Sequence, residues 1–224
     1  MSTTRRAAAL IVIAKAPVAG RSKTRLTPPC SPDQAAALAE AALRDTLEAV
    51  AAVPGRRRIL VLEGEPGPWL PNGFEVVPQR AGGLDERLTG AFATTSGPAF
   101  LVGMDTPQIT PEIVERGVAE LERPDVDAVL GAAEDGGYWS IGLERPDDRV
   151  FRGVPMSVES TGEAQRLRLT ELGLRHVELE PLLDVDTIAD ALIVAEAAPR
   201  SNFAQVLKRL ELGARPKHEQ PPTP

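Results

Sequence analysis

The sequence LIVIAKAPVAGRSKTRL, at residues 10–26, decides the fold class because it joins a short apolar run to a basic loop. Residues 10–13 have the length and the branched side chains of a buried strand. The proline and the glycine that follow predict a loop. The segment SPDQ at residues 31–34 then predicts a helix, with serine as N-cap, proline in the first turn and glutamine completing a capping box. The chain thus contains a strand, a loop and a helix in succession.

The same alternation continues along the chain. Further strands are expected at residues 59–62, 75–77, 100–103, 127–131, 138–143 and 175–179. Further helices are expected at residues 84–95, 110–121, 163–172, 187–197 and 203–212. Strands that alternate with helices predict an α/β fold, with a mostly parallel central sheet and helices on both faces. We expect one domain over residues 1–212, followed by a disordered, polar and proline-rich tail at residues 213–224.

Composition excludes several classes of protein. The 224 residues are 42% hydrophobic and 25% charged, which suits a chain with one sizeable core. The single cysteine excludes a disulfide scaffold, and no apolar run reaches the ~20 residues of a membrane span. The net charge of −7 argues against a nucleic-acid partner. The apolar run after Arg6 is interrupted by Lys15, which argues against an export signal, so a cytoplasmic location is expected.

The charge is unevenly distributed. Residues 1–32 carry +6 and no acid, so the rest of the chain carries −13. We interpret Arg5 and Arg6 as a solvated arm. The other cations of this segment are Lys15, Arg21, Lys23 and Arg25. The last three alternate across five residues beside Gly20, a pattern that fits a phosphate-binding loop as well as an ordinary solvated loop.

Three aspartates are candidates for binding a divalent cation. Asp105 follows the apolar strand at residues 100–103, where a carboxylate can bind Mg²⁺ or Mn²⁺ or can cap a turn. Asp184 and Asp186 are alternate residues, and on an extended segment their side chains point to the same side. The alternative for this pair is capping of the helix that follows, because Thr187 and Asp190 resemble a capping box.

The segment DGGYW at residues 135–139 is a further candidate. Its two glycines let the backbone approach a ligand closely, Asp135 supplies a charge, and Tyr138 and Trp139 offer flat apolar surface. A plain β-hairpin turn would also explain the aspartate and the glycines, but we prefer a functional role.

Four of these segments, taken together, resemble a known family. Residues 14–26, with Lys-Ala-Pro, Gly20 and Lys-Thr-Arg-Leu, resemble the opening of the bacterial glycosyltransferase-like family linked with arsenosugar biosynthesis. The segments GMDTP at 103–107, DGGYW at 135–139 and DVDT at 184–187 follow in the same order. The Lys-Thr-Arg-Leu and Asp-Val-Asp-Thr segments are also similar to those of phospholactate and phosphoenolpyruvate guanylyltransferases. The resemblance covers about residues 8–197 and implies the nucleotide-diphospho-sugar transferase superfamily, with its GT-A-type, Rossmann-like fold.

The resemblance implies a nucleotide-dependent transferase that uses Mg²⁺ or Mn²⁺. It implies that the metal is bound by Asp105 with Asp184 or Asp186. It assigns Asp135 and Lys23 to catalysis, and Gly136, Gly137, Tyr138 and Trp139 to the acceptor side. The residues implied to bind the nucleotide and its phosphates are Lys15, Gly20, Arg21, Lys23, Thr24, Arg25 and Arg87.

Three residues depart from the family pattern. Asp85 stands where a glycine is expected, Met156 where a tryptophan is usual before Ser157, and Ile188 where a proline usually follows Asp-Thr. These departures concern the acceptor site and the start of the helix after Thr187. The family resemblance therefore says least about which acceptor is used.

Three functions stay open at this point. The complete DGGYW segment favours glycosyl transfer from a nucleotide sugar to a small-molecule acceptor, which we prefer. The basic loop favours the alternative, nucleotidyl (guanylyl) transfer from a nucleoside triphosphate to a phosphorylated small molecule. A non-catalytic nucleotide-binding protein is the third candidate, against which the presence of all three metal-binding aspartates argues. The base, the sugar, the acceptor and the oligomeric state also stay open.

Overall fold

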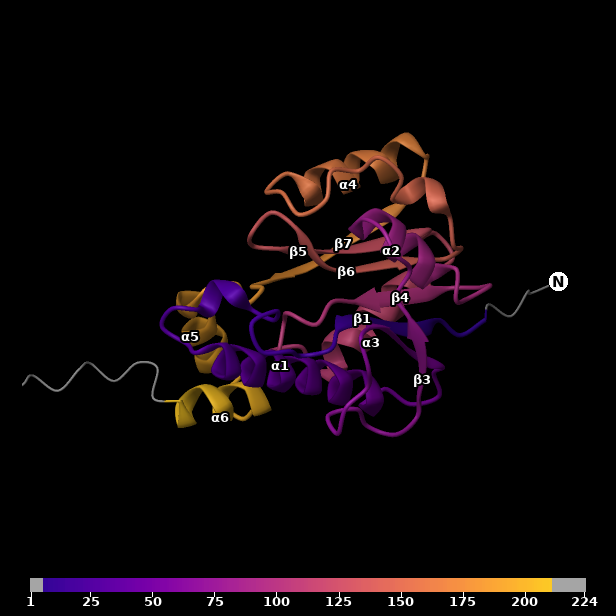
Figure 1. The fold of residues 1–224 in the computed structure, drawn as a ribbon. Coiled ribbons are helices and arrows are strands. Elements are labelled where there is room, and N and C mark those ends of the chain that lie inside the picture. Colours follow the sequence, from indigo (N-terminus) through magenta and orange to yellow (C-terminus); the bar gives the residue numbers. More distant parts are fainter. Residues whose placement is uncertain (1–5, 211–224) are drawn as a thin grey trace, which may run out of the picture.

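Seven strands form one sheet in the computed structural model, which describes residues 6–210 (Figure 1). The strands are β1 (Ala9–Lys15), β2 (Arg58–Glu63), β3 (Phe74–Pro78), β4 (Ala99–Val102), β5 (Ala128–Ala133), β6 (Tyr138–Leu143) and β7 (His176–Leu182). The α-helices are α1 (Pro32–Ala52), α2 (Leu84–Phe92), α3 (Pro111–Leu121), α4 (Thr161–Glu171), α5 (Ile188–Ala197) and α6 (Asn202–Arg209). Two short 3₁₀ helices, η1 (Thr24–Leu26) and η2 (Asp148–Val150), were not expected. The expected tail and Arg5 lie outside the described residues.

The sheet has the strand order β3-β2-β1-β4-β6-β5-β7. β6 is antiparallel to both of its neighbours, and every other pair of adjacent strands is parallel. The carboxyl ends of β1, β4, β5 and β7 therefore meet at one edge of the sheet, together with the amino end of β6. The expectation of a mostly parallel sheet is confirmed.

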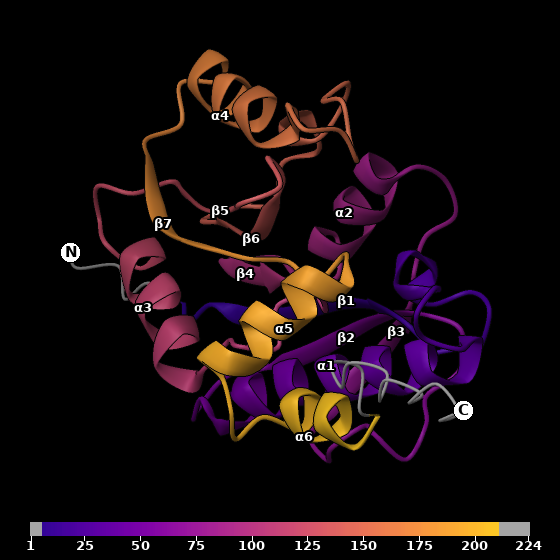
Figure 2. The ribbon, with the colours of Figure 1, turned by 90° about the vertical axis from the view of Figure 1, so that its left-hand side faces the viewer.

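Helices cover both faces of the sheet, as expected. Along β1, Leu10 and Val12 face α1 and α3, whereas Ile11 faces α2 and α4 on the other side (Figure 1). This alternation follows from the two-residue period of a strand, and these β1 side chains are almost fully buried. α5 and α6 pack on the outer side of α1 and form a third apolar cluster with it (Figure 2). No helix among the described residues is both long and apolar enough to cross a membrane.

The start of α1 forms as the sequence predicts. The Ser31 side chain accepts a hydrogen bond from the Gln34 backbone, and the Gln34 side chain accepts one from the Ser31 backbone. Pro32 occupies the first turn, where its missing N–H costs nothing. This capping box fixes the point at which the basic loop ends.

Asp45 of α1 anchors the start of α6. One carboxylate oxygen accepts hydrogen bonds from the Asn202 backbone and side chain, both at 2.8 Å, and the other accepts one from the Phe203 backbone at 2.9 Å. Asp45→Ala leaves these donors without their partner, so we expect it to lower the free energy of unfolding by about 1–3 kcal/mol. Urea denaturation measures this loss. The control is Glu48→Ala, because exposed Glu48 also contacts the Asn202 side chain; an equal loss in both variants would contradict the anchoring role.

Candidate active site

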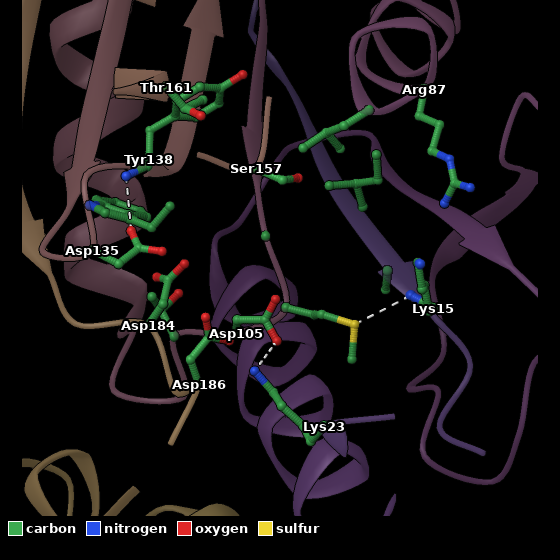
Figure 3. A pocket seen from close by; sticks show the side chains of 18 of the residues that line it. Lys15, Lys23, Arg87, Asp105, Asp135, Tyr138, Ser157, Thr161, Asp184 and Asp186 are labelled. Carbon is green, nitrogen blue, oxygen red and sulfur yellow. Dashed lines mark hydrogen bonds and ion pairs between the residues drawn. The ribbon is translucent and has the colours of Figure 1, made fainter. Parts of the chain in front are cut away.

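A pocket opens where the order of the strands reverses. β2, the next strand along the chain, pairs with one side of β1, and β4 pairs with the other side of β1. In open α/β sheets, ligands bind outside the carboxyl ends of the strands at such a switch point. A pocket of about 860 Å³ lies there, lined by residues that follow β1 and β4 (Figure 3).

The charged residues that line this pocket divide by their place in the sequence. Of the residues that the structure describes, the lining ones before position 103 contribute five cations and no acid, and those from position 103 onward contribute five acids and no cation. We call the first group the cationic side; it consists of Lys15, Arg21, Lys23, Arg25 and Arg87. We call the second group the acidic side; it consists of Asp105, Asp135, Glu159, Asp184 and Asp186. Figure 3 shows Lys15 and Arg87 across the pocket from Asp135 and Asp184.

Lys23 joins the two sides. Its ammonium group forms an ion pair with the Asp105 carboxylate and donates a hydrogen bond to the Val185 carbonyl oxygen (Figure 3). Only 9% of its side chain is exposed, and its backbone has a left-handed φ of 47°. Nearby, an Arg25 nitrogen lies 2.7 Å from an Asp186 oxygen. The basic loop is therefore held against the carboxylates by two ion pairs.

The three candidate metal-binding aspartates lie together. The Val185 N–H donates to the Asp105 carbonyl oxygen at 2.9 Å, which places Asp184 and Asp186 on either side of this contact. The side chain of Val185 is fully buried, so the contact is fixed by packing as well as by the hydrogen bond. The sequence alone did not place Asp105 next to this pair.

Asp184 differs from Asp186 in its surroundings. One Asp184 carboxylate oxygen is buried and has no hydrogen-bond partner within residues 6–210. Burial raises the pKa of Asp184 to about 7, and the charges of Asp105 and Asp135 act in the same direction. Asp186 is more exposed and is paired with Arg25. A buried carboxylate without a partner has a strong need for a cation.

Asp105 and Asp184 fit a metal ion that is completed by a ligand. Among the described residues, no group of three or more His, Cys, Asp and Glu side chains could hold a metal ion. Mg²⁺ is commonly held by one or two carboxylates, with phosphate oxygens and water completing its coordination. The unpartnered oxygen of Asp184 beside Asp105 suits this arrangement.

The Asp-Gly-Gly turn is packed against the start of α4. The Asp135 carboxylate accepts a hydrogen bond from the Gly137 N–H at 2.9 Å, and the Gly136 carbonyl accepts one from the Gly162 N–H at 2.8 Å. Gly136 has a φ of +88°, and a Cβ atom there would lie 1.9 Å from the Glu159 carbonyl oxygen. Position 136 therefore needs a glycine for its backbone and for the close approach of residue 159.

Tyr138 and Trp139 line the pocket, but their polar groups point into the protein. The Tyr138 hydroxyl lies 3.4 Å from the Gln165 side chain, and burial raises the pKa of this hydroxyl. The Trp139 indole is 2% exposed, donates to the Glu180 carbonyl at 3.2 Å and packs edge-on against Phe100. Neither ring therefore presents a free polar group to the acceptor side.

The other residues expected at the site differ in whether they line the pocket. Lys15 and Arg87 both pair with Glu63 at the end of β2, and Arg21 and Thr24 line the pocket. Gly20 and Gly136 are not among the described residues that line it. Arg6 lies away from this pocket and reaches the Ser96 hydroxyl at 3.5 Å.

Sequence reasoning missed the segment at residues 157–161. Ser157, Val158, Glu159 and Thr161 all line the pocket, although only Ser157 was noted, as the neighbour of an unusual methionine. Ser157 has a φ of +60°, and among the described residues Lys23 is the only other non-glycine residue with a positive φ. Strained backbone of this kind gathers at functional sites. The amino-acid type carries no signal for it, because serine does not favour this conformation.

The comparisons with known proteins identify the fold. No curated protein matches the chain. A solved protein of Desulfovibrio desulfuricans G20, named as a nucleotide-diphospho-sugar transferase, is 24% identical with a TM-score of 0.80, over 90% of this chain and 94% of that one. A cytidylyltransferase of Leptospira borgpetersenii is 13% identical with a TM-score of 0.57, over 92% of this chain and 94% of that one. CMP:2-keto-3-deoxy-manno-octonic acid synthetase, solved with CTP, is 16% identical with a TM-score of 0.53, over 85% and 100% of the two chains.

These similarities show a shared fold and confirm the expected fold of nucleotide-diphospho-sugar transferases. The family comparison adds a match to residues 36–158, which is more than half of the chain and includes β2 to β6. The chain therefore belongs to the bacterial family described as "Uncharacterized protein conserved in bacteria (DUF2064)".

Proposed function

We propose that this protein is a divalent-metal-dependent transferase that moves a glycosyl group from a nucleotide sugar to a small acceptor. The observation that carries the proposal is one pocket that combines five cations with five acids, with an unpartnered oxygen of Asp184 next to Asp105. A nucleotide sugar has two parts that match this pocket. Its diphosphate needs cations to bind it, and its sugar needs a neighbouring site where the acceptor can bind.

The cationic side suits the diphosphate of the donor. Lys23 and Arg25 are each paired with a carboxylate of the acidic side. Phosphate oxygens form charge-assisted hydrogen bonds with such groups, and arginine can bind two oxygens at once. When the donor binds, these two side chains exchange a carboxylate for phosphate oxygens.

Asp105 and Asp184 would hold Mg²⁺ or Mn²⁺ between the two sides. The ion supplies charge that offsets the negative charge on the departing diphosphate. The Lys23 ammonium lies beside the same carboxylates and adds a second positive charge to that region. The two aspartates keep their positions because Val185 ties them together.

Asp135 would accept a proton from the acceptor. Its carboxylate lines the pocket on the acidic side and is oriented by the hydrogen bond from the Gly137 N–H. In glycosyl transfer, an acceptor hydroxyl attacks the anomeric carbon, and the bond from that carbon to the nucleoside diphosphate breaks. The hydroxyl proton passes to Asp135, which acts as general base.

Nucleotidyl transfer is the second candidate, and the number of cations favours it. Five cations are among the described residues that line the pocket, which is enough to hold a triphosphate. Attack would then occur at the α-phosphorus, and the leaving group would be pyrophosphate. The cytidylyltransferase of Leptospira borgpetersenii and the synthetase solved with CTP share the fold.

A screen of thermal unfolding distinguishes the two reactions. The protein is heated with Mn²⁺ and either nucleotide sugars or the corresponding nucleoside triphosphates. We expect a nucleotide sugar to raise the melting temperature more than the triphosphate of the same base does. A larger shift with the triphosphate would favour nucleotidyl transfer, and no shift with either class would contradict both reactions.

The double variant Lys23→Ala, Arg25→Ala tests the phosphate site. Losing two charge-assisted contacts is expected to weaken nucleotide affinity about 100-fold, measured by calorimetry in Mn²⁺. The matched control is Lys208→Ala, Arg209→Ala, which removes the same charge from an exposed part of α6. Equal affinity in the two double variants would show that the loop does not bind phosphate.

A further inference from the structure

The proposed function puts the acceptor beside Asp135, where two segments that line the pocket hold each other in place; we call this part the acceptor region. The Asp-Gly-Gly turn contributes Asp135, and the segment at residues 157–161 contributes Ser157 and Glu159. The two segments are joined by the hydrogen bond from Gly162 to Gly136. In Figure 3, Ser157 projects into the space between the acidic side and Arg87.

The charges of this region are negative. Its charged residues are Asp135 and Glu159. No lysine or arginine is among the described lining residues from position 103 onward. Four of the five cations of the opposite side are paired with a carboxylate: Lys15 and Arg87 with Glu63, Lys23 with Asp105, and Arg25 with Asp186. The fifth, Arg21, belongs to the loop that the proposed function assigns to the donor.

The start of α4 offers no substitute for a cation. A helix N-terminus can bind an anion when its first N–H groups are free. Here the Thr161 N–H donates to the Val158 carbonyl, and the Gly162 N–H donates to the Gly136 carbonyl. The first turn also carries the acidic Glu163. The helix end nearest the pocket is therefore both occupied and negatively charged.

We infer that the acceptor carries no phosphate: it is an uncharged or positively charged molecule that bears hydroxyl or amino groups. This inference rests on the proposed function, because it concerns the acceptor side of the same pocket. Carboxylates accept hydrogen bonds from hydroxyl and ammonium groups, and the Ser157 hydroxyl can donate or accept one. A phosphate group, with a charge of about −1.5 to −2 at pH 7, would be repelled by Asp135 and Glu159.

The inference also selects between the two reactions of the proposed function. Transfer of a nucleotidyl group to a phosphorylated molecule needs a phosphate oxygen as nucleophile, and this region repels one. In glycosyl transfer the nucleophile is a hydroxyl oxygen, which forms the new bond to the anomeric carbon while its proton passes to Asp135. The nucleoside diphosphate leaves with the electron pair of the broken bond.

Paired probes that differ only in a phosphate test the inference. Glycerol is compared with glycerol 3-phosphate, and glucosamine with glucosamine 6-phosphate, by calorimetric titration of the full chain with Mn²⁺ and a saturating nucleoside diphosphate. We expect no phosphorylated probe to bind more tightly than its partner. Tighter binding of either phosphorylated probe would overturn the inference.

A charge reversal sharpens the test. Glu159→Lys is expected to shift the affinity ratio of each pair at least about tenfold toward the phosphorylated probe, because it replaces repulsion by attraction. Glu196→Lys is the matched control: it makes the same charge change on an exposed residue of α5 that is not among the residues lining the pocket. Equal shifts in the two variants, or no shift in Glu159→Lys, would overturn the inference.

A different measurement tests the proposed function on its own. Titration with nucleotide alone contains no acceptor probe, so absence of nucleotide binding contradicts the proposed function by itself. The ratio between paired probes is then measured on the protein without nucleotide. The charge argument applies there too, because Asp135 and Glu159 line the pocket whether or not a donor is bound.

Discussion

The Asp184→Asn variant is expected to lose metal-dependent nucleotide binding and yet to be more stable than the wild type without metal. Its carboxylate is buried beside Asp105 and Asp135, with one oxygen lacking a partner. We expect nucleotide affinity in Mn²⁺ to fall at least about 100-fold, because only Asp105 remains to hold the ion. Calorimetric titration measures this loss.

The gain in stability follows from the direction of the pKa shift. Folding raises the pKa of Asp184 from its ordinary value of 3.8 to about 7. The stabilisation supplied by the bound proton is complete below about pH 4 and is lost as the pH rises through 7. At pH 8 the folded protein therefore contains a buried charge, and its neutral replacement should raise the free energy of unfolding by roughly 2 kcal/mol.

Asp186→Asn is the matched control for this variant. Asp186 is partly exposed and already paired with Arg25. Its replacement should not raise stability in chelator at pH 8. If Asp184→Asn kept the nucleotide affinity of the wild type, or if it unfolded more easily than the wild type without metal, the role of Asp184 as a metal ligand would be contradicted.

Gly136→Ala should be among the most destabilising single substitutions at the pocket. Its Cβ atom would lie 1.9 Å from the Glu159 carbonyl oxygen, on a backbone with a φ of +88°. Backbone strain and overpacking each cost about 1–3 kcal/mol, so we expect the free energy of unfolding to fall by about 4 kcal/mol. Urea denaturation followed by circular dichroism measures this change.

Gly153→Ala separates the two causes. Gly153 has a similar φ of +74°, but a Cβ atom there would meet nothing within 4 Å. Only the strain of the left-handed backbone remains, which costs about 1–2 kcal/mol. If the two variants lost the same stability, the segment at residues 157–161 would not rest on the Asp-Gly-Gly turn as the structure describes.

The order of the elements could be predicted from local sequence signals. The capping box of Ser31 and Gln34, the apolar run of β1 and the proline at the start of α3 act over a few residues, and each is observed. Sheet formation then follows from the alternation of strands and helices. The antiparallel direction of β6 follows from the tight turn at residues 135–137.

The pocket was less accessible to sequence reasoning because its contacts join distant residues. The hydrogen bond from Val185 to Asp105 spans 80 positions, and Lys23 reaches Val185 across 162 positions. No local pattern encodes these contacts. They arise because the carboxyl ends of β4 and β7 meet at one edge of the sheet.

Strand geometry could have predicted that the side chains of Tyr138 and Trp139 point in opposite directions. Tyr138 and Trp139 are neighbours at the start of β6, and adjacent side chains of a strand point to opposite faces. Tyr138 packs with the apolar cluster under α2 and α4, and Trp139 packs with the cluster under α1 and α3. The two rings therefore could not both present a flat surface to one acceptor.

The uneven distribution of charge along the sequence reappears in the pocket. The basic segment at residues 1–32 supplies four of the five lining cations, and the acidic remainder supplies every lining acid. A net charge of −7 conceals this division. The positions of the charges along the sequence, rather than their sum, pointed to the proposed site.

The most direct test of the central claim is a calorimetric titration of the wild-type protein with nucleotide sugars, in Mn²⁺ and in excess chelator. Our account predicts saturable binding of at least one nucleotide sugar in Mn²⁺ and at least about 100-fold weaker binding in chelator, because phosphate oxygens complete the coordination of the ion at Asp105 and Asp184. The same affinity in both conditions would contradict a metal-dependent transferase.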